Sequence, residues 1–219
     1  MHSPPYVIAV SGLKGGIGKS TVAVNLACAL HRASHRTLLV DADPQGTSRA
    51  WAALAAERGQ EGPPVASIDG KTLRRDLARI GQGFAFVIID TPPRLGTEVR
   101  ASMMAAQLVL LPVISGGPDV WALEDTVALV QEAQALRPEL AAFVLLNRAD
   151  RTVLAREAAS AIAALDVPVL VTRFGSRVAY GEATLAGLGV VDYAPDSEAA
   201  FEVRRLVREL ALPGVGEAA

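Results

Sequence analysis

A glycine-rich segment near the start of the chain combines residue types that can hold phosphate. It follows an apolar run, opens a helical pattern and runs Lys14-Gly15-Gly16-Ile17-Gly18-Lys19-Ser20-Thr21. Backbone N–H groups of such a turn and of a helix N-terminus point at one spot, and a lysine adds a full positive charge. Ser20 then offers a hydroxyl to Mg²⁺. The segment predicts a nucleotide phosphate site; the structural alternative is a tight turn with an incidental lysine.

Lysine usage singles out the same loop. Of the 21 basic residues only three are lysines, Lys14, Lys19 and Lys71, and two of these lie in the loop. A compact ammonium fits a tight phosphate cradle that a planar guanidinium does not. We therefore expect both loop lysines to serve phosphate.

Carboxylates end two other apolar runs. A carboxylate at Asp90, after Val87-Ile88-Ile89, is costly unless something binds it, and holding Mg²⁺ through water would compensate. Asp41 and Asp43 are two residues apart, so they share a face if their strand persists that far. The alternatives are a satisfied strand-end aspartate at 90 and helix caps at 41 and 43.

Short apolar runs alternate with helical patterns along the whole chain. Strands are expected at 6–11, 37–41, 84–90, 108–113, 142–147 and 167–172, and helices at 19–34, 46–58, 71–80, 97–106, 119–136, 152–164 and 197–211. The strand runs are near-continuously apolar, which is typical of strands covered on both faces. This predicts one domain over 1–219, with a frayed tail at 213–219. Its fold is a doubly wound, mostly parallel α/β sheet that binds ligands at the carboxyl ends of its strands.

The amino-acid composition excludes several classes of protein. With 51% apolar residues and a net charge of −2, the chain is neither disordered nor a globally basic nucleic-acid binder. Cys28 is the single cysteine, so no intrachain disulfide can form, and the three histidines lack zinc-ligand spacing. The N-terminus lacks a signal-peptide pattern, and no apolar run reaches the ~20 residues of a membrane span. We expect a cytoplasmic protein.

The loop departs from the usual P-loop, because Leu13 takes the place of its first glycine and Lys14 adds a second lysine. Here the sequence resembles the deviant Walker A ATPases of the ParA/MinD family. The resemblance covers almost the whole chain. Segments that also resemble the family are Asp41-Ala42-Asp43-Pro44-Gln45-Gly46, Val87 to Pro93, Pro118 to Leu123 and Arg173 to Arg177. In length, the chain is most similar to the short ParF-type partition ATPases.

The resemblance implies a P-loop NTPase fold, ATP and Mg²⁺ as cofactors, and ATP hydrolysis. Lys19 would contact the β- and γ-phosphates of its own subunit, while Lys14 would cross a dimer interface to the partner's nucleotide. Asp43 would position or deprotonate the attacking water. Ser20, Asp41 and Asp90 would serve the Mg²⁺ shell.

Asn147 and Arg148 follow the run Phe143-Val144-Leu145-Leu146 at the same expected sheet edge. In the family, an asparagine here contacts the adenine edge. Its amide offers both a donor and an acceptor, which suits adenine. A turn-forming asparagine is the alternative.

The resemblance further implies a nucleoid-associated partition ATPase that dimerises with ATP and binds DNA nonspecifically. A ParB- or ParG-like partner would stimulate hydrolysis and drive plasmid or chromosome segregation. A protein cargo is an open alternative. A MinD-like membrane ATPase is disfavoured because ordinary packing explains the last helix, and an iron-sulfur relative would need paired cysteines.

The DNA surface would come from arginines near two strand ends, since nonspecific binding can rest on phosphate contacts alone. The candidates are Arg148, Arg151, Arg156, Arg173 and Arg177. A solvated surface is the alternative for each.

Overall fold

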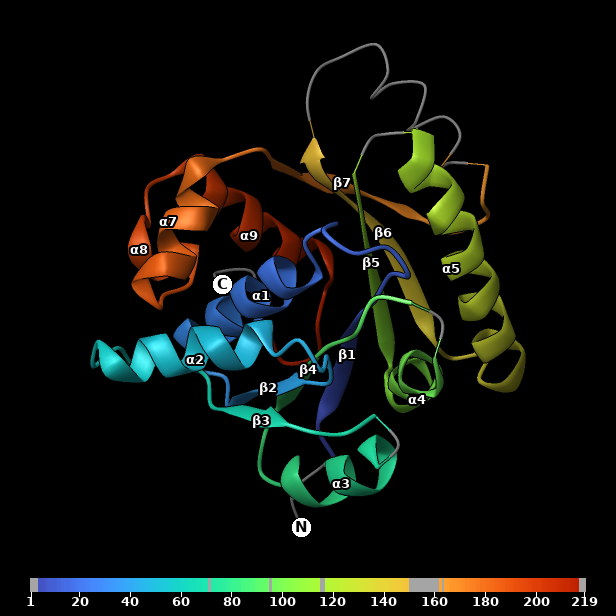
Figure 1. The fold of residues 1–219 in the computed structure, drawn as a ribbon, viewed down its shortest axis with the longest axis horizontal. Helices are drawn as coiled ribbons and strands as arrows, with labels where there is room; N and C mark the ends of the chain where they lie inside the picture. Colours follow the sequence, from blue (N-terminus) through green and yellow to red (C-terminus); the bar gives the residue numbers. More distant parts are fainter. Residues whose placement is uncertain are drawn as a thin grey trace.

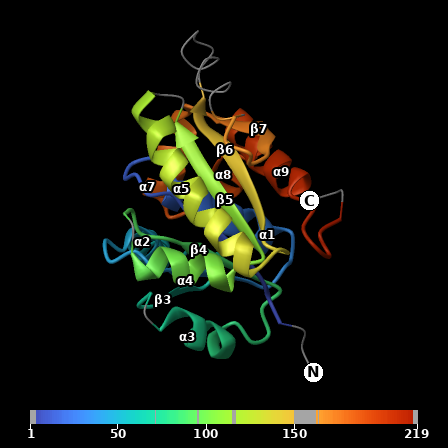
Figure 2. The same cartoon turned by 90° about the vertical axis from the view of Figure 1, so that its right-hand side faces the viewer.

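The computed structural model describes residues 4–70, 72–94, 96–114, 117–149, 162 and 164–216. Within these ranges, strands and helices alternate along the chain (Figure 1). The strands lie in one central layer between two layers of helices (Figure 1), and one of these layers lies in front of the strands when the molecule is turned by 90° (Figure 2).

Seven strands of the described ranges form one sheet in the order β3-β2-β4-β1-β5-β6-β7, and every neighbouring pair is parallel. Their bounds are β1 Tyr6–Val10, β2 Thr37–Asp41, β3 Val65–Ser67, β4 Phe86–Asp90, β5 Leu108–Ile114, β6 Ala141–Ala149 and β7 Val169–Gly175. Apart from Tyr6 at the start of β1, the strands β1, β2 and β4 are buried throughout, as expected when both faces are covered.

Two sets of helices cover the two faces. The described helices are α1 Lys19–Arg32, α2 Thr47–Glu57, α3 Leu73–Ile80, α4 Thr97–Ala105, α5 Gly117–Leu136, α7 Val178–Ala186, α8 Val190–Tyr193 and α9 Glu198–Glu209. One hydrophobic cluster joins α1, α2, α7, α8 and α9 to one face, and the other joins α3, α4 and α5 to the opposite face. This confirms the doubly wound α/β fold.

Three elements were not expected from the sequence. β3 is three residues long and not fully buried, so it lacks an apolar run. α7 exposes Val178 and Leu185 and contains Gly181, so its apolar and polar residues do not separate onto two faces. α8 is a single turn of four residues. The expected helix at 152–164 falls largely outside the described residues.

The parallel register brings the predicted site residues to one edge. Asp90 on β4 is paired with Val10 on β1 and Asp41 on β2, and Asn147 on β6 lies beside Ile114 on β5. β4 and β5, which follow one another in the chain, lie on either side of β1. The glycine-rich loop begins at the carboxyl end of β1. Open α/β sheets bind ligands at such a point.

Candidate nucleotide-binding site

The glycine-rich loop adopts backbone conformations that favour glycine. Gly16 and Gly18 have φ values of 79° and 92°, in the left-handed region. A Cβ on Gly18 would lie 2.2 Å from Asn147 Nδ2, so the position is also crowded. Gly18 precedes the first turn of α1, and its carbonyl accepts a hydrogen bond from Val22 N at 2.9 Å. The loop therefore delivers the chain into α1 with the helix N-terminus facing the site.

Asn147 ties the end of β6 to this loop. Its side chain is buried, Nδ2 donates to Ile17 O at 2.7 Å, and Oδ1 accepts from Arg148 N at 2.9 Å. In this conformation the amide supports the loop and a local turn of the backbone. Its contact with adenine stays a prediction.

Lys19 begins α1 and is only 6% exposed. Its Nζ donates to Lys14 O at 2.9 Å, within the loop itself. Burial lowers the pKa of the ammonium, while the nearby Asp90 and Asp43 carboxylates act in the opposite direction. A buried cation at the N-terminus of a helix is suited to a phosphate.

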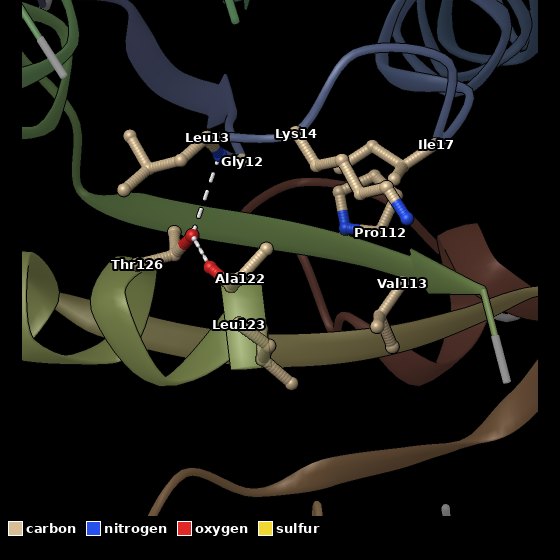
Figure 3. Close-up of a pocket in the computed structure, with 9 residues that line it drawn as sticks. All are labelled: Gly12, Leu13, Lys14, Ile17, Pro112, Val113, Ala122, Leu123 and Thr126. Carbon is tan, nitrogen blue, oxygen red and sulfur yellow. Dashed lines mark hydrogen bonds between the residues drawn. The ribbon is translucent and has the colours of Figure 1, made fainter. Parts of the chain in front are cut away.

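Lys14 lies at the start of the loop and borders a small pocket lined by the loop, β5 and α5. Its side chain extends alongside Pro112 and below Ile17 (Figure 3). Thr126 on α5 anchors this end of the loop, because its Oγ1 accepts from Leu13 N at 3.3 Å and donates to Ala122 O at 2.8 Å. The reach of Lys14 to a partner's nucleotide stays a prediction.

Asp90 is fully buried, and its two carboxylate oxygens differ. Oδ2 accepts a hydrogen bond from Ser48 Oγ at 2.7 Å, whereas Oδ1 has no hydrogen-bond partner within the described part of the chain. Burial raises the pKa of Asp90 to about 6, although the hydroxyls of Ser48 and Ser20 favour the charged form. An unpartnered buried oxygen beside a phosphate loop fits a cation.

The other two acids are held by the turn before α2. Asp41 is buried and accepts from Asp43 N at 3.1 Å and from Arg49 N at 2.9 Å, in the first turn of α2. The bond from Arg49 N satisfies a backbone N–H in the first turn of α2, as a helix cap does, although the N-cap residue itself is Gly46. Asp43 Oδ1 accepts from Gln45 N at 3.0 Å. Their roles toward water and Mg²⁺ stay predictions.

The donor set suits an ion that arrives with phosphate. Among the described residues, no group of three or more His, Cys, Asp or Glu could hold a metal. Mg²⁺ is commonly held by one or two carboxylates together with substrate phosphates and water. Asp90 Oδ1, with Ser20 close by, fits that pattern.

A cavity of about 640 Å³ opens beside the N-terminus of α1. Gly18 and Thr21 border it on the loop side, and Asn147 and Arg148 at the end of β6. The other wall is the β7–α7 connection and α7, with lining residues Gly175, Ser176, Arg177, Val178, Tyr180, Gly181, Thr184 and Leu185. This wall was not predicted from the sequence. The segment Arg173 to Arg177, which resembles the family, was the available signal, but its two arginines were assigned to DNA.

The five candidate DNA-binding arginines have different surroundings. Arg148 and Arg173 are exposed at the ends of the neighbouring strands β6 and β7. The Arg177 guanidinium is bonded to Glu202 at 3.0 Å. Arg151 and Arg156 lie outside the described residues. No helix of the described ranges is long and apolar enough to cross a membrane.

Comparison with known proteins agrees with this geometry. The model of the CobQ/CobB/MinD/ParA nucleotide binding domain matches residues 8–188. The chain is 31% identical to "Maintenance of carboxysome distribution protein A" of Halothiobacillus neapolitanus, covering 94% of this chain and 96% of that protein. It is 32% identical to the chromosome-partitioning ATPase Soj of Thermus thermophilus, covering 93% of this chain and 94% of that protein.

Solved structures share the fold. A Cyanothece McdA variant in complex with ATP superposes with a TM-score of 0.78 at 19% identity, covering 98% of this chain and 100% of that one. The cell division ATPase MinD of Pyrococcus furiosus gives a TM-score of 0.77 at 22% identity, covering 94% and 98%.

Proposed function

The chain belongs to the CobQ/CobB/MinD/ParA nucleotide-binding family, and on that premise we propose that it is a ParA-type ATPase that positions a cargo in the cell. The observation that carries the ATPase assignment is the buried Asp90 beside the glycine-rich loop and Lys19, with one oxygen that finds no partner among the described residues. Two relatives of nearly full length support cargo positioning, one named for carboxysome distribution and one for chromosome partitioning.

The loop and α1 would bind the nucleotide. The N–H groups of Gly15 to Thr21 and the Lys19 ammonium would hold the phosphates of ATP. Asp90 and Ser20 would hold Mg²⁺, which neutralises phosphate charge when it is bound. Burial makes these contacts strong because water does not compete for them.

Hydrolysis would need an oriented water and a second positive charge. Asp43 is half-buried at the edge of the site and is the residue we assign to the water. Lys14 would complete the partner subunit's site in an ATP-dependent dimer, stabilising charge that develops during transfer. Hydrolysis would then separate the subunits.

The dimer would hold nonspecific DNA, and a ParB- or ParG-like protein would stimulate hydrolysis. Arg148 and Arg173 project from neighbouring strands at one sheet edge, and dimerisation would double this patch. We include Arg151 and Arg156 in it. Of the three that the structure describes, Arg177 is the least suited, since its guanidinium is already paired with Glu202.

Purified protein tests the proposal. With Mg²⁺ it should hydrolyse ATP, and Asp43→Ala should bind ATP, accumulate as a dimer and hydrolyse slowly. Duplex DNA of unrelated sequence should bind in the presence of ATP, poorly with ADP, and less as salt rises. Undiminished turnover by Asp43→Ala would remove Asp43 from the mechanism, and equal DNA binding with ADP would contradict the switch.

The class of cargo needs an experiment in cells. Fluorescent fusions should colocalise with the nucleoid, and deletion of the gene should disturb the spacing of its cargo. Mislocalised DNA loci with evenly spaced protein assemblies would favour a plasmid or chromosome cargo. The reverse result would favour the protein cargo suggested by the carboxysome-distribution relatives.

A further inference from the structure

Glu202 on α9 is a buried carboxylate with a full set of donors, distant from the phosphate loop in sequence. It is 4% exposed. Oε1 accepts from Arg177 Nε at 3.2 Å and Nη2 at 3.0 Å, and Oε2 accepts from Gly175 N at 3.1 Å and from the Tyr180 hydroxyl at 3.0 Å. One side chain therefore holds the end of β7, the turn after it and the first turn of α7.

All three partners of Glu202 line the cavity beside the loop. Gly175 permits the arrangement, because a Cβ there would lie 2.8 Å from Arg177 Nε. Tyr180 is fixed a second time, since its ring stacks on Phe174 with centroids 5.4 Å apart. Burial and the adjacent carboxylate raise the pKa of the Tyr180 hydroxyl, so it stays a donor. The wall is thus rigidly positioned from behind.

The cavity is suited to the nucleoside part of a nucleotide. It borders Gly18 and Thr21, where the phosphates would end, and Asn147 offers an amide at its edge. Val178 and Leu185 on its α7 side are 77% and 70% exposed, so a planar apolar ring could cover them. Ligand cavities commonly combine apolar walls with a few fixed polar groups.

We propose that Glu202 is a positioning residue for the nucleoside, acting through Arg177, Tyr180 and Gly175 on the wall of this cavity. The proposal rests on the proposed function, since it takes ATP as the ligand. It assigns Arg177 to the nucleotide site and not to DNA. Glu202 touches neither phosphate nor base itself, so its loss should weaken recognition of the nucleoside while leaving the phosphate cradle intact.

Glu209 provides a matched control. It lies seven residues after Glu202, two turns along α9 and on the same side of the helix. Its carboxylate also bonds the backbone of β7, accepting from Val171 N at 2.6 Å and Thr172 N at 2.8 Å. Neither of those residues lines the cavity. Glu209→Gln therefore perturbs the same helix and strand without touching the wall.

The test compares ATP, GTP and inorganic tripolyphosphate, each with Mg²⁺, by isothermal titration calorimetry. Glu202→Gln should raise the Kd for ATP about tenfold and bring the ATP and GTP affinities closer together, because charge-assisted bonds to the wall are lost. The Kd for tripolyphosphate should change by less than about twofold, as should every Kd of Glu209→Gln. Arg177→Ala should behave like Glu202→Gln.

Equal weakening of ATP and tripolyphosphate in Glu202→Gln, or an unchanged Kd for ATP, would overturn the assignment. If that variant does not fold, Tyr180→Phe keeps the ring stack and removes the hydroxyl that donates to Glu202 and to the Ala199 carbonyl. It should still lower ATP affinity selectively, by about twofold to threefold. Its failure to do so would also count against the proposal. If the wild-type protein binds neither ATP nor GTP, the proposed function is contradicted. If the wild-type protein binds ATP but the variants do not show the expected effects, only the role of Glu202 is contradicted.

Discussion

Asp90 and Glu202 are both buried carboxylates, at opposite ends of the candidate site, and their hydrogen bonds differ. Asp90 Oδ2 accepts one hydrogen bond and Oδ1 accepts none within the described residues. Both oxygens of Glu202 are occupied, by a guanidinium, a backbone N–H and a hydroxyl. A buried acceptor without a partner is costly, which is why we propose that a ligand binds at Asp90. A satisfied one marks a place where the protein positions its own chain.

The two ends also differ in how they are assembled. At the phosphate end, Lys19 and the glycines lie within one short loop. At the nucleoside end, β6, β7, α7 and α9 each contribute a part of the wall or its support. Binding of phosphate should therefore depend on few residues and strongly on each, while binding of the nucleoside should depend on several residues and less on each.

Lys19→Ala tests the phosphate end with the largest expected effect. It removes the buried ammonium beside Asp90 and Asp43, so the Kd for ATP should rise by at least about a hundredfold. Calorimetry measures this, and circular dichroism checks the fold. Lys19→Arg is the matched control: if compact geometry matters, it should bind nearly as poorly. Tight ATP binding by Lys19→Arg would show that charge alone suffices.

Lys14→Ala separates the two lysines of that end. The substitution should raise the Kd for ATP by less than about tenfold, yet abolish ATP-dependent dimerisation and most turnover, because the ammonium would act in the partner's site. Size-exclusion chromatography and phosphate release measure both effects. In heterodimers of Lys14→Ala with Asp43→Ala, one site keeps Asp43 and receives an intact Lys14. Inactive heterodimers, once shown to form, would contradict action in trans.

A carboxylate-to-amide change should have opposite effects on the stability of the ligand-free protein at the two ends. Asp90→Asn removes a buried charge with an unpartnered oxygen and should raise the free energy of unfolding by about 1 kcal/mol, while Mg²⁺-dependent ATP binding is lost. Glu202→Gln breaks charge-assisted bonds and should lower the free energy of unfolding by about 2 kcal/mol. Urea unfolding at pH 7 measures both. Changes of the same sign would remove the distinction between the two carboxylates.

Asn147→Ala tests the junction of the two ends with a smaller effect. It removes the bond to Ile17 O, so the free energy of unfolding should fall by about 1–2 kcal/mol. Because the amide supports the phosphate loop, the Kd values for tripolyphosphate and for ATP should both rise, by about threefold. A loss for ATP beyond the loss for tripolyphosphate would show that the amide also contacts adenine, as predicted from the sequence. Asn147→Asp serves as the control, because it keeps an oxygen that accepts from Arg148 N and removes the amide group that donates to Ile17 O.

Local patterns in the sequence were sufficient to place the glycine-rich loop and most of the fold. The loop residues are contiguous, and each strand that carries an acid has an unbroken apolar run before it, so strand ends such as Asp41 and Asp90 were placed correctly. Parallel pairing then brings such ends to one edge whatever the connections are. Short or weakly patterned elements, β3, α7 and α8, gave no such signal.

Only the tertiary structure decided which polar groups are satisfied. From sequence, Asp41 and Asp90 were both metal candidates; the fold gives Asp41 two backbone donors and leaves Asp90 Oδ1 without one among the described residues. Likewise, the sequence predicted Arg177 to be a surface cation, whereas the fold places Glu202 of α9 against its guanidinium. The physical reason is that hydrogen bonding and burial depend on contacts between distant segments, whereas strand and loop formation depend on neighbours in the chain.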